Sequence, residues 1–375
     1  MWIPAGCIDC IYWLFSVALS YRHRILIKIT RSAEWKSISK KEKQKLGLVT
    51  DDDGEFWMSW EDFTIQFTDL SIVHLINTSL FSFSKTWRES SLQGRWQRPE
   101  LAGGCLNHPN TFLANPQIRF DLPGKEEEEV VVQLSQKEDT ELTRVERDKL
   151  VIGFHLMKVE SNREYRLHQR QAGNECGTSD FIRSRHVFLR CSLPPGRYLV
   201  VPSTFEPGQE GKFLLRIFSS RINRVDPLVL EQPPSPCLLF CGLGSLHCLV
   251  TRLTIVGAAS LEKQDLVGSA DPYVKVRCEG QHWSSRAVKN CLHPDWDFSV
   301  VCFRKKPGKA IKIEVWNCNL VRDQLMGVVS VEARNEGREE RQMELCRAGN
   351  QEEGQLKAPG TISLVIETSK DLASF

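Results

Sequence analysis

The sequence predicts a mainly β protein built from two antiparallel β-sandwiches. Short segments with alternating apolar residues recur from about residue 85 onward, Pro and Gly lie between them, and a Pro-rich stretch at 231–236 divides them into two groups. No glycine-rich phosphate loop and no alternation of strands with helices is present, so nucleotide-binding α/β folds are not expected.

Each group supplies enough strands for one sandwich. In the first group we expect strands at 115–122, 130–134, 150–159, 186–193, 196–205 and 211–220. In the second group we expect them at 249–261, 271–280, 284–290, 297–306, 310–317, 325–333 and 360–368, with an eighth strand near Met343.

Composition narrows the functional classes. A length of 375 residues suggests two or three domains, and a formal net charge of +2 implies no overall attraction to nucleic acid. The 13 cysteines are scattered, with one C-x-x-C at Cys7 and Cys10, which indicates reduced thiols and a cytoplasmic protein. The apolar run Ile11–Ser20 is shorter than the roughly 20 residues that span a bilayer, so we expect no transmembrane segment.

Three segments of the second group resemble C2 domains. VGSADPYVKV (267–276), preceded by LEKQDLVG, is similar to the first calcium-binding loop of that family. HPDWDFSVVCF (293–303) matches the family's Asn-Pro-x-Trp-Asn strand entry, and IEVWNCNLVRDQLMG (313–327) matches its third loop. The resemblance implies a C2 domain at 245–370.

This resemblance also implies a calcium site, from which the sequence departs. Asn317 and Asn319 stand where the family usually has aspartates, leaving Asp265, Asp271 and Asp323. Because calcium takes six to eight oxygen ligands and charged ones raise its affinity, these five residues predict a weak or vestigial Ca²⁺ site. The alternative is that they close their loops through hydrogen bonds to the backbone.

A basic surface is the second membrane feature that the resemblance implies. C2 domains bind anionic phosphoinositide headgroups on a basic strand face, and each basic residue adds roughly 1 kcal/mol near an anionic surface. Ordinary solvated strand faces are the alternative. The candidate residues are Lys275, Arg277, Arg286, Lys289, Arg304, Lys305 and Lys306.

The rest of the chain resembles calpains. EWKSISKKEKQKLGL followed by DDDGEFWMSWEDF (34–63) is similar to the end of the calpain protease core, and segments 85–96, 102–120 and 197–219 resemble the calpain β-sandwich, domain III. Ending in a C2 domain is typical of the atypical calpains, the calpain five and six type. The expected organisation is an unassigned segment at 1–30, a short α+β remnant of a papain-like protease core at 31–80, domain III at 81–225, a linker at 226–244 and the C2 domain.

The resemblance does not supply catalytic residues. Calpains use a cysteine, a histidine and an asparagine, but residues 20–33 (SYRHRILIKITRSA) contain neither the histidine motif nor the asparagine motif expected near this position. We therefore assign no catalytic residue. Asp53 and Glu55 match half of a calcium site of the protease core; the alternative is a turn before an aromatic strand.

Three functional hypotheses follow. The first is a non-catalytic calpain-like fragment that docks on anionic membrane lipids or proteins, cytoplasmic or peripheral at membranes. The second is membership of a calcium-dependent cysteine endopeptidase family whose full-length form performs intracellular regulatory proteolysis. The third is a cytoskeleton-binding, non-proteolytic calpain.

Overall fold

The computed structural model describes residues 41, 87–124, 126–137, 149–171, 173–221, 224–233, 247–265, 268–319, 321–347 and 356–375. Apart from Lys41, the expected N-terminal segment 1–30 and protease-core remnant 31–80 lie outside these residues, as do Asp53 and Glu55. No helix in the described part of the chain is long and apolar enough to cross a bilayer.

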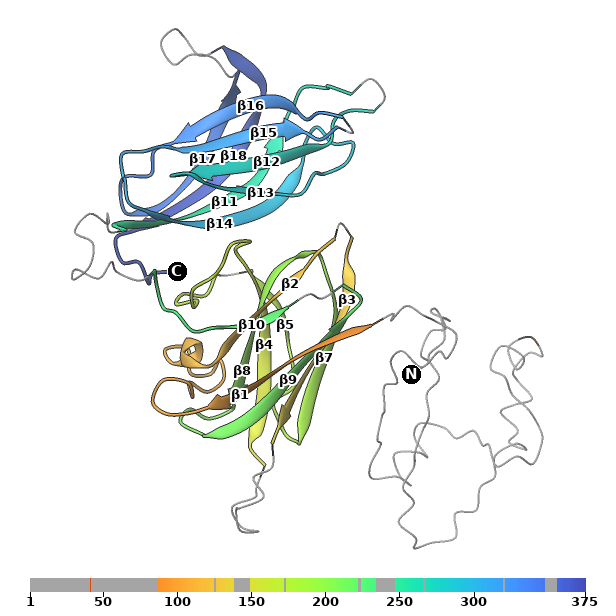
Figure 1. Cartoon of the computed structure of the whole chain (residues 1–375), viewed down its shortest axis with the longest axis vertical. Helices are drawn as coiled ribbons and strands as arrows, with labels where there is room; N and C mark the ends of the chain where they lie inside the picture. The colour runs from red at the N-terminus through yellow and green to blue at the C-terminus, as the bar shows by residue number, and fades with distance from the viewer. Residues whose placement is uncertain are drawn as a thin grey trace, which may run out of the picture. The chain divides into compact units, whose positions relative to one another are not determined.

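The N-terminal sandwich consists of two antiparallel sheets (Figure 1). One sheet has the order β1-β9-β3-β7, with β1 (Arg88–Trp96), β9 (Gly211–Ser219), β3 (Glu128–Gln136) and β7 (His186–Leu193). The other has the order β10-β2-β8-β4-β5, with β6 paired to β4. Its strands are β10 (Val225–Leu228), β2 (Gln117–Leu122), β8 (Gly196–Thr204), β4 (Val151–Val159), β5 (Glu175–Thr178) and β6 (Ile182–Arg183).

The core of this sandwich is formed by strands that are buried on one face and by strands that are buried on both faces. β3 and β9 alternate between buried and half-exposed residues, as expected for strands with one face in a core. β4 and β8 are buried almost throughout. Their second face is covered because Phe112 of the short 3₁₀ helix η2 (Phe112–Ala114), Leu167 and Leu228 pack on it.

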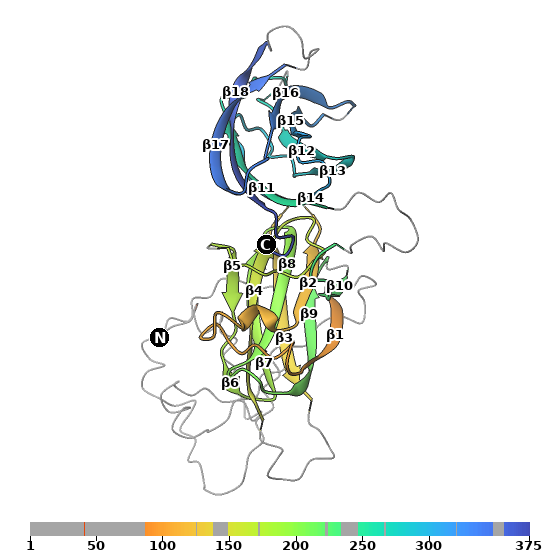
Figure 2. The same cartoon turned by 90° about the vertical axis from the view of Figure 1, so that its left-hand side faces the viewer.

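The eight strands of the C-terminal sandwich form one continuous hydrogen-bonded order, β13-β12-β15-β16-β17-β18-β11-β14, which folds over into two layers (Figure 2). Figure 2 shows β17, β18 and β11 on one side and β16, β15, β12 and β13 on the other. The strands enclose one large apolar core. They are β11 (Leu249–Ala259), β12 (Pro272–Cys278), β13 (Gln281–Ser284), β14 (Asp295–Arg304), β15 (Ile311–Asn317), β16 (Gln324–Val331), β17 (Gly337–Cys346) and β18 (Lys357–Ser369).

The mainly β, antiparallel fold is confirmed, and β17 is the strand expected near Met343. The strand expected at 284–290 is wrong. Beyond Ser284 this stretch is irregular because its amides bind the start of β12 instead, with Ser285 N donating to Val274 O and Val288 N to Pro272 O. The expected linker at 226–244 begins inside β10, which pairs with β2.

The segment that follows β4 lies against β14. Asn162 Nδ2 donates to Val301 O at 2.7 Å, Val301 N donates to Asn162 Oδ1 at 2.8 Å, and Ser161 N donates to Ser299 O at 2.9 Å. Since β14 ends the eight-strand order, these bonds satisfy part of an edge that would otherwise present free backbone groups.

Candidate functional site

The predicted calcium residues lie at one end of the β12–β15 pair. Pro272, the first residue of β12, is paired with Asn317, the last residue of β15, so Asp271 and Asn317 are brought together by strand register. Cys318 N donates to Asp271 O at 2.9 Å and continues this pairing into the third loop. Asp265 comes from the segment between β11 and β12.

Asn317 is the centre of this group. Its side chain is fully buried; Oδ1 accepts a hydrogen bond from Asp271 N at 2.7 Å, and Nδ2 donates to Asp265 Oδ1 at 2.7 Å. The backbone N–H of Asp271 fixes the amide orientation, since a rotated amide would face that donor with its own N–H groups. Asn317 therefore presents an N–H, not an oxygen, to Asp265.

The other carboxylates also have protein donors. Asp271 Oδ1 accepts from Asn290 N at 2.8 Å. Asp323 Oδ2 accepts from the Tyr273 hydroxyl at 2.6 Å, and its Oδ1 accepts from Asn319 N at 3.1 Å. These two hydrogen bonds, the tyrosine one foremost, lower the pKa of Asp323.

This arrangement does not fit a calcium ion. Calcium needs six to eight oxygens converging on one point, whereas here an amide N–H points at one carboxylate and backbone or hydroxyl donors occupy the others. Among the described residues, no group of three or more His, Cys, Asp and Glu side chains is placed to hold a metal. Asn317 joins Asp265 to Asp271, and Asp323 joins Tyr273 to Asn319, so the predicted residues form two sets of loop-closing hydrogen bonds.

A basic and aromatic surface lies on β12 and β15, and we call it the β12–β15 face: Tyr273, Lys275, Arg277, Lys312, Glu314 and Trp316. Lys275 is opposite Glu314, and Arg277 is opposite Lys312. Lys275 Nζ lies 4.4 Å from the centroid of the Trp316 ring and 5.1 Å from that of the Tyr273 ring. Such cation–π contacts hold an ammonium group over an apolar ring at the surface.

Glu314 organises the cations of this face. Its side chain is buried, and it binds Lys312 Nζ at 3.0 Å and Arg277 Nε at 3.3 Å. Burial alone raises the pKa of Glu314, but hydrogen bonds from Lys312 and Trp316, together with the nearby positive charges, lower it overall. The carboxylate therefore stays ionised and keeps two like charges side by side.

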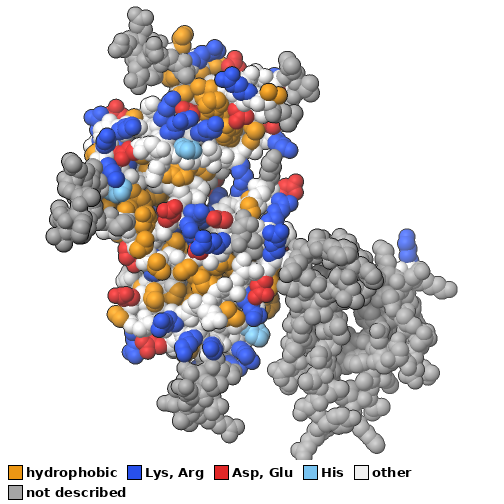
Figure 3. Space-filling view, viewed as in Figure 1, with side chains coloured by type: hydrophobic (Ala, Val, Ile, Leu, Met, Phe, Trp, Pro, Cys, Tyr) orange, Lys and Arg blue, Asp and Glu red, His pale blue; other side chains and the backbone are white. Residues whose placement is uncertain are grey.

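The seven predicted lipid-binding residues come from three segments of the C2 domain, and the backbone amides of Lys305 and Lys306 donate to Glu279 in the turn after β12. Lys275 and Arg277 lie on β12, Arg286 and Lys289 follow β13, and Lys305 and Lys306 follow β14, which borders β11. In the space-filling view, Lys and Arg side chains lie beside hydrophobic ones over the C-terminal sandwich (Figure 3).

Arg304 must be removed from the predicted surface. It is fully buried, and its guanidinium donates to the carbonyl oxygens of Ala333, Pro307 and Lys309. These bonds from the two terminal nitrogens hold a turn together, and because the side chain is fully buried it presents no donor to a headgroup at the surface. Conversely, the sequence reasoning missed Lys312 and Trp316, although the alternation in AIKIEVWN (310–317) places both with Glu314 on one face.

Protein-family models agree with this architecture. Residues 29–74 match the calpain family cysteine protease model, residues 92–218 match domain III of the calpain large subunit, and residues 250–346 match the C2 domain. Among solved structures, a C2 domain of plant extended synaptotagmin 1 aligns with a TM-score of 0.29 and 18% identity, covering 32% of this chain and 95% of that one.

Two curated relatives match most of the chain. Calpain-5 of Mus musculus is 40% identical over 304 residues, which are 80% of this chain and 46% of the relative. Calpain-5 of Caenorhabditis elegans is 34% identical over 313 residues, or 79% of this chain and 46% of the relative. The chain spans about half the length of these relatives. It belongs to the calpain family, as an atypical member in which domain III is followed by a C2 domain.

Proposed function

We propose that this chain is a docking module that binds anionic membrane surfaces through the β12–β15 face of its C2 domain, without calcium as a switch. The observation that carries the proposal is the buried amide of Asn317, whose N–H is directed at Asp265 where a calcium-binding loop needs an oxygen. With the loops closed by the protein's own donors, the remaining attraction to a membrane comes from Lys275, Arg277 and Lys312.

Electrostatics and the aromatic rings support this surface. Basic residues near an anionic membrane contribute roughly 1 kcal/mol each, and aromatic rings favour the boundary between headgroups and water. The half-buried ring of Trp316 lies beside Lys275 on this face, and the ring of Tyr273 is buried next to it. The module would then be cytoplasmic and peripheral at membranes that carry phosphoinositides or phosphatidylserine.

Co-sedimentation with vesicles tests this function. The 375-residue chain should bind vesicles containing phosphatidylserine or a phosphoinositide equally well with calcium and with chelator. The double variant Lys275→Gln, Arg277→Gln should bind about thirtyfold more weakly, since two contacts of roughly 1 kcal/mol each are lost. Lys312 is retained in this variant because it keeps buried Glu314 paired.

The matched control is Lys305→Gln, Lys306→Gln, which removes the same charge from exposed residues outside the face. Calcium-dependent binding, or a loss confined to the control, contradicts the proposal. Thermal unfolding of each variant checks that its fold is intact.

Regulated proteolysis is the second candidate function, favoured by the match of residues 29–74 to the calpain family cysteine protease. Under this alternative the docking module belongs to a calcium-dependent cysteine endopeptidase whose catalytic residues lie elsewhere. We expect the purified 375-residue chain not to cleave casein. Cleavage that is lost on alkylation of its cysteines would contradict the non-catalytic function.

A further inference from the structure

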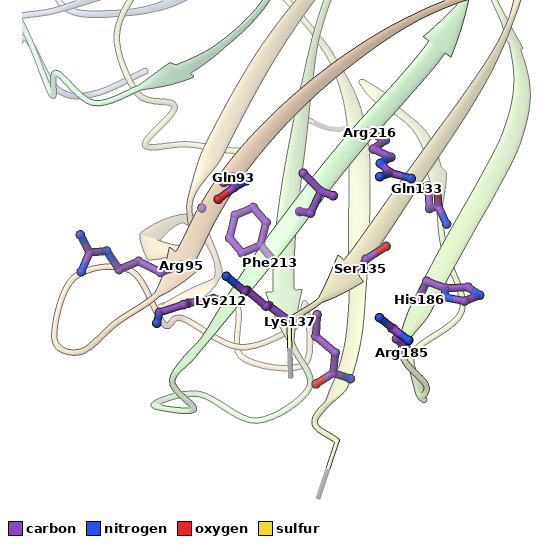
Figure 4. A pocket seen from close by; sticks show the side chains of 13 residues that line it. Gln93, Arg95, Gln133, Ser135, Lys137, Arg185, His186, Lys212, Phe213 and Arg216 are labelled. Atoms are coloured by element: carbon purple, nitrogen blue, oxygen red, sulfur yellow. The ribbon is translucent and has the colours of Figure 1, made fainter. Parts of the chain in front are cut away.

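At one end of the domain III sheet, a positive side chain lies in or directly next to each of its four strands. Arg95 of β1 is paired with Lys212 of β9. Lys137, which follows β3, donates its backbone N–H to Lys212 O at 2.9 Å, and Arg185, which precedes β7, accepts from Gln136 N at 2.9 Å. Figure 4 shows Arg95, Lys212, Lys137 and Arg185 in this order across the sheet, and we call them the cation row.

The cation row borders a hollow of about 840 Å³ on the outer face of this sheet. The next row of side chains contains no Lys, Arg, Asp or Glu, with Gln93 opposite Leu214, Leu214 opposite Ser135, and Ser135 opposite His186. Arg216 and Gln133 continue the lining. None of the described residues that line the hollow is acidic. Its surface therefore offers cations along one side, with amide and hydroxyl groups next to them.

The basic side chains of this sheet are ion-paired away from the cation row but not within it. Away from the row, Arg216 is paired with Glu89 and Arg190 with Glu129. Within the part of the chain that the structure describes, no carboxylate forms an ion pair with any of the four row residues, and all four are exposed. Like charges directly opposite each other destabilise a sheet, so an unpaired row opposes folding unless an anion compensates it.

The dimensions of the row select the kind of anion. Neighbouring strands are about 4.8 Å apart, so four strands spread the charges over about 14 Å. An extended peptide rises about 3.3 Å per residue and turns alternate side chains to one side, so about five residues cross the row with three carboxylates facing it. A single phosphate is too small to reach more than part of the row, and a flat vesicle surface does not enter a hollow.

We propose that this hollow binds an extended acidic segment of a partner protein. Its Glu or Asp side chains pair with Arg95, Lys212, Lys137 and Arg185, and Gln93 and Gln133 hydrogen-bond to its backbone. The proposal does not depend on membrane docking by the C2 domain, which uses other residues.

Fluorescence anisotropy with the full chain and a labelled peptide of alternating glutamate and glycine tests the proposal. We expect saturable binding that weakens with salt, and no binding of the matched peptide of glutamine and glycine. The variant Lys137→Glu, Lys212→Glu should reduce the affinity at least about tenfold, since it removes two attractive charges and adds two repulsive ones. The matched variant Lys305→Glu, Lys306→Glu should leave it unchanged.

Each other outcome overturns the proposal. If both double variants weaken peptide binding equally, the peptide is attracted to positive charge in general and not to the hollow. Loss of phosphatidylserine vesicle binding by the Lys137, Lys212 variant, with peptide binding intact, means a membrane site. Peptide binding that appears only after Glu138→Gln, Asp139→Asn and Glu141→Gln means that the chain's own acidic residues occupy the hollow. Thermal unfolding identifies a variant that has lost its fold, and the milder Lys212→Gln then replaces it, with a smaller loss expected.

Discussion

At the residue scale, the C2 loops depend on one amide group. Asn317 joins the first loop, through Asp265 and Asp271, to the end of β15. An aspartate at this position would keep the acceptor for the Asp271 amide but would place a carboxylate against that of Asp265. The exchange of a single nitrogen for oxygen therefore decides whether these loops attract a cation or hold each other.

Asn317→Asp should make the C2 domain respond to calcium. In chelator we expect a loss of about 1–3 kcal/mol in the free energy of unfolding, because a buried hydrogen bond is replaced by repulsion between carboxylates. Calcium should then raise the melting temperature of the variant but not that of the wild type. Asn319→Asp is the control, since it breaks no side-chain hydrogen bond described in the structure. Its free energy of unfolding in chelator should fall by less. A calcium-induced rise in the wild type would contradict this account.

A buried charge cluster lies between β4 and the C2 sheet. Glu160 Oε2 is 2.7 Å from Arg163 Nη2, Glu160 Oε1 is 3.7 Å from Arg252 Nη1, and Arg252 Nε donates to Glu367 at 2.7 Å. Glu160, Arg163 and Arg252 are each no more than 3% exposed. Burial alone raises the pKa of Glu160, but the charge and hydrogen bond of Arg163 and the charge of Arg252 lower it overall.

Glu160→Gln should destabilise the chain in a pH-dependent way. Removing one partner from a buried ion pair costs about 3–5 kcal/mol. Because the pKa of Glu160 is lower in the folded state, its contribution is complete above the ordinary value of 4.5 and is lost as the pH falls below it. The gap in melting temperature between wild type and variant should be constant from about pH 7 to 5 and narrow below about 4.5. A gap that is independent of pH, or equal to that of the exposed control Glu332→Gln, would contradict this role.

At the element scale, strand register creates features that no local stretch of sequence shows. The four residues of the cation row are isolated in the sequence, and only the pairing of β1 with β9, β9 with β3 and β3 with β7 brings them together. The β12–β15 face likewise combines two strands that lie far apart in the sequence. Both surfaces are therefore products of pairing.

Lys212→Gln should stabilise domain III. Lys212 is directly opposite Arg95 and next to Lys137, so its removal relieves repulsion and should raise the free energy of unfolding by about 0.2–1 kcal/mol. The gain should be larger at low ionic strength, where the charges are less screened. Lys370→Gln removes the same charge from a pair with Glu336, so chemical denaturation should show no gain. A gain in both variants would instead indicate general charge repulsion.

Alternation and turn residues predict most of the strands, because a half-buried strand must repeat every two residues. The same rule places Lys312 with Trp316 but cannot place Arg304, whose neighbours Lys305 and Lys306 suggested a surface run. Burial of Arg304 depends on the carbonyl groups of Ala333, Pro307 and Lys309, which come from other parts of the fold. β1 (RESSLQGRW) was missed because its apolar positions are few. The candidate loop residues were identified by type, but their mutual hydrogen bonds required the tertiary structure.

At the scale of the whole molecule, the two proposed binding surfaces are local concentrations of charge on a nearly neutral chain. The formal net charge of +2 gives no long-range attraction to anionic partners. The β12–β15 face and the cation row lie on different sheets and share no residue. Their positive charges are nevertheless accessible to solvent, so association at either surface should be sensitive to salt.

Substitutions at one surface should therefore weaken binding there and leave binding at the other surface unchanged. Lys275→Gln with Arg277→Gln should weaken vesicle binding while the affinity for the glutamate–glycine peptide stays within about twofold, and Lys137→Glu with Lys212→Glu should do the reverse. Raising the salt concentration from about 0.05 to about 0.5 M shortens the Debye length severalfold, so both wild-type affinities should fall while thermal stability changes little. Parallel titrations of one protein preparation with vesicles and with peptide measure both effects. If each pair of substitutions weakened both ligands equally, the molecule would possess one diffuse basic surface, and the assignment of separate sites to domain III and the C2 domain would be wrong.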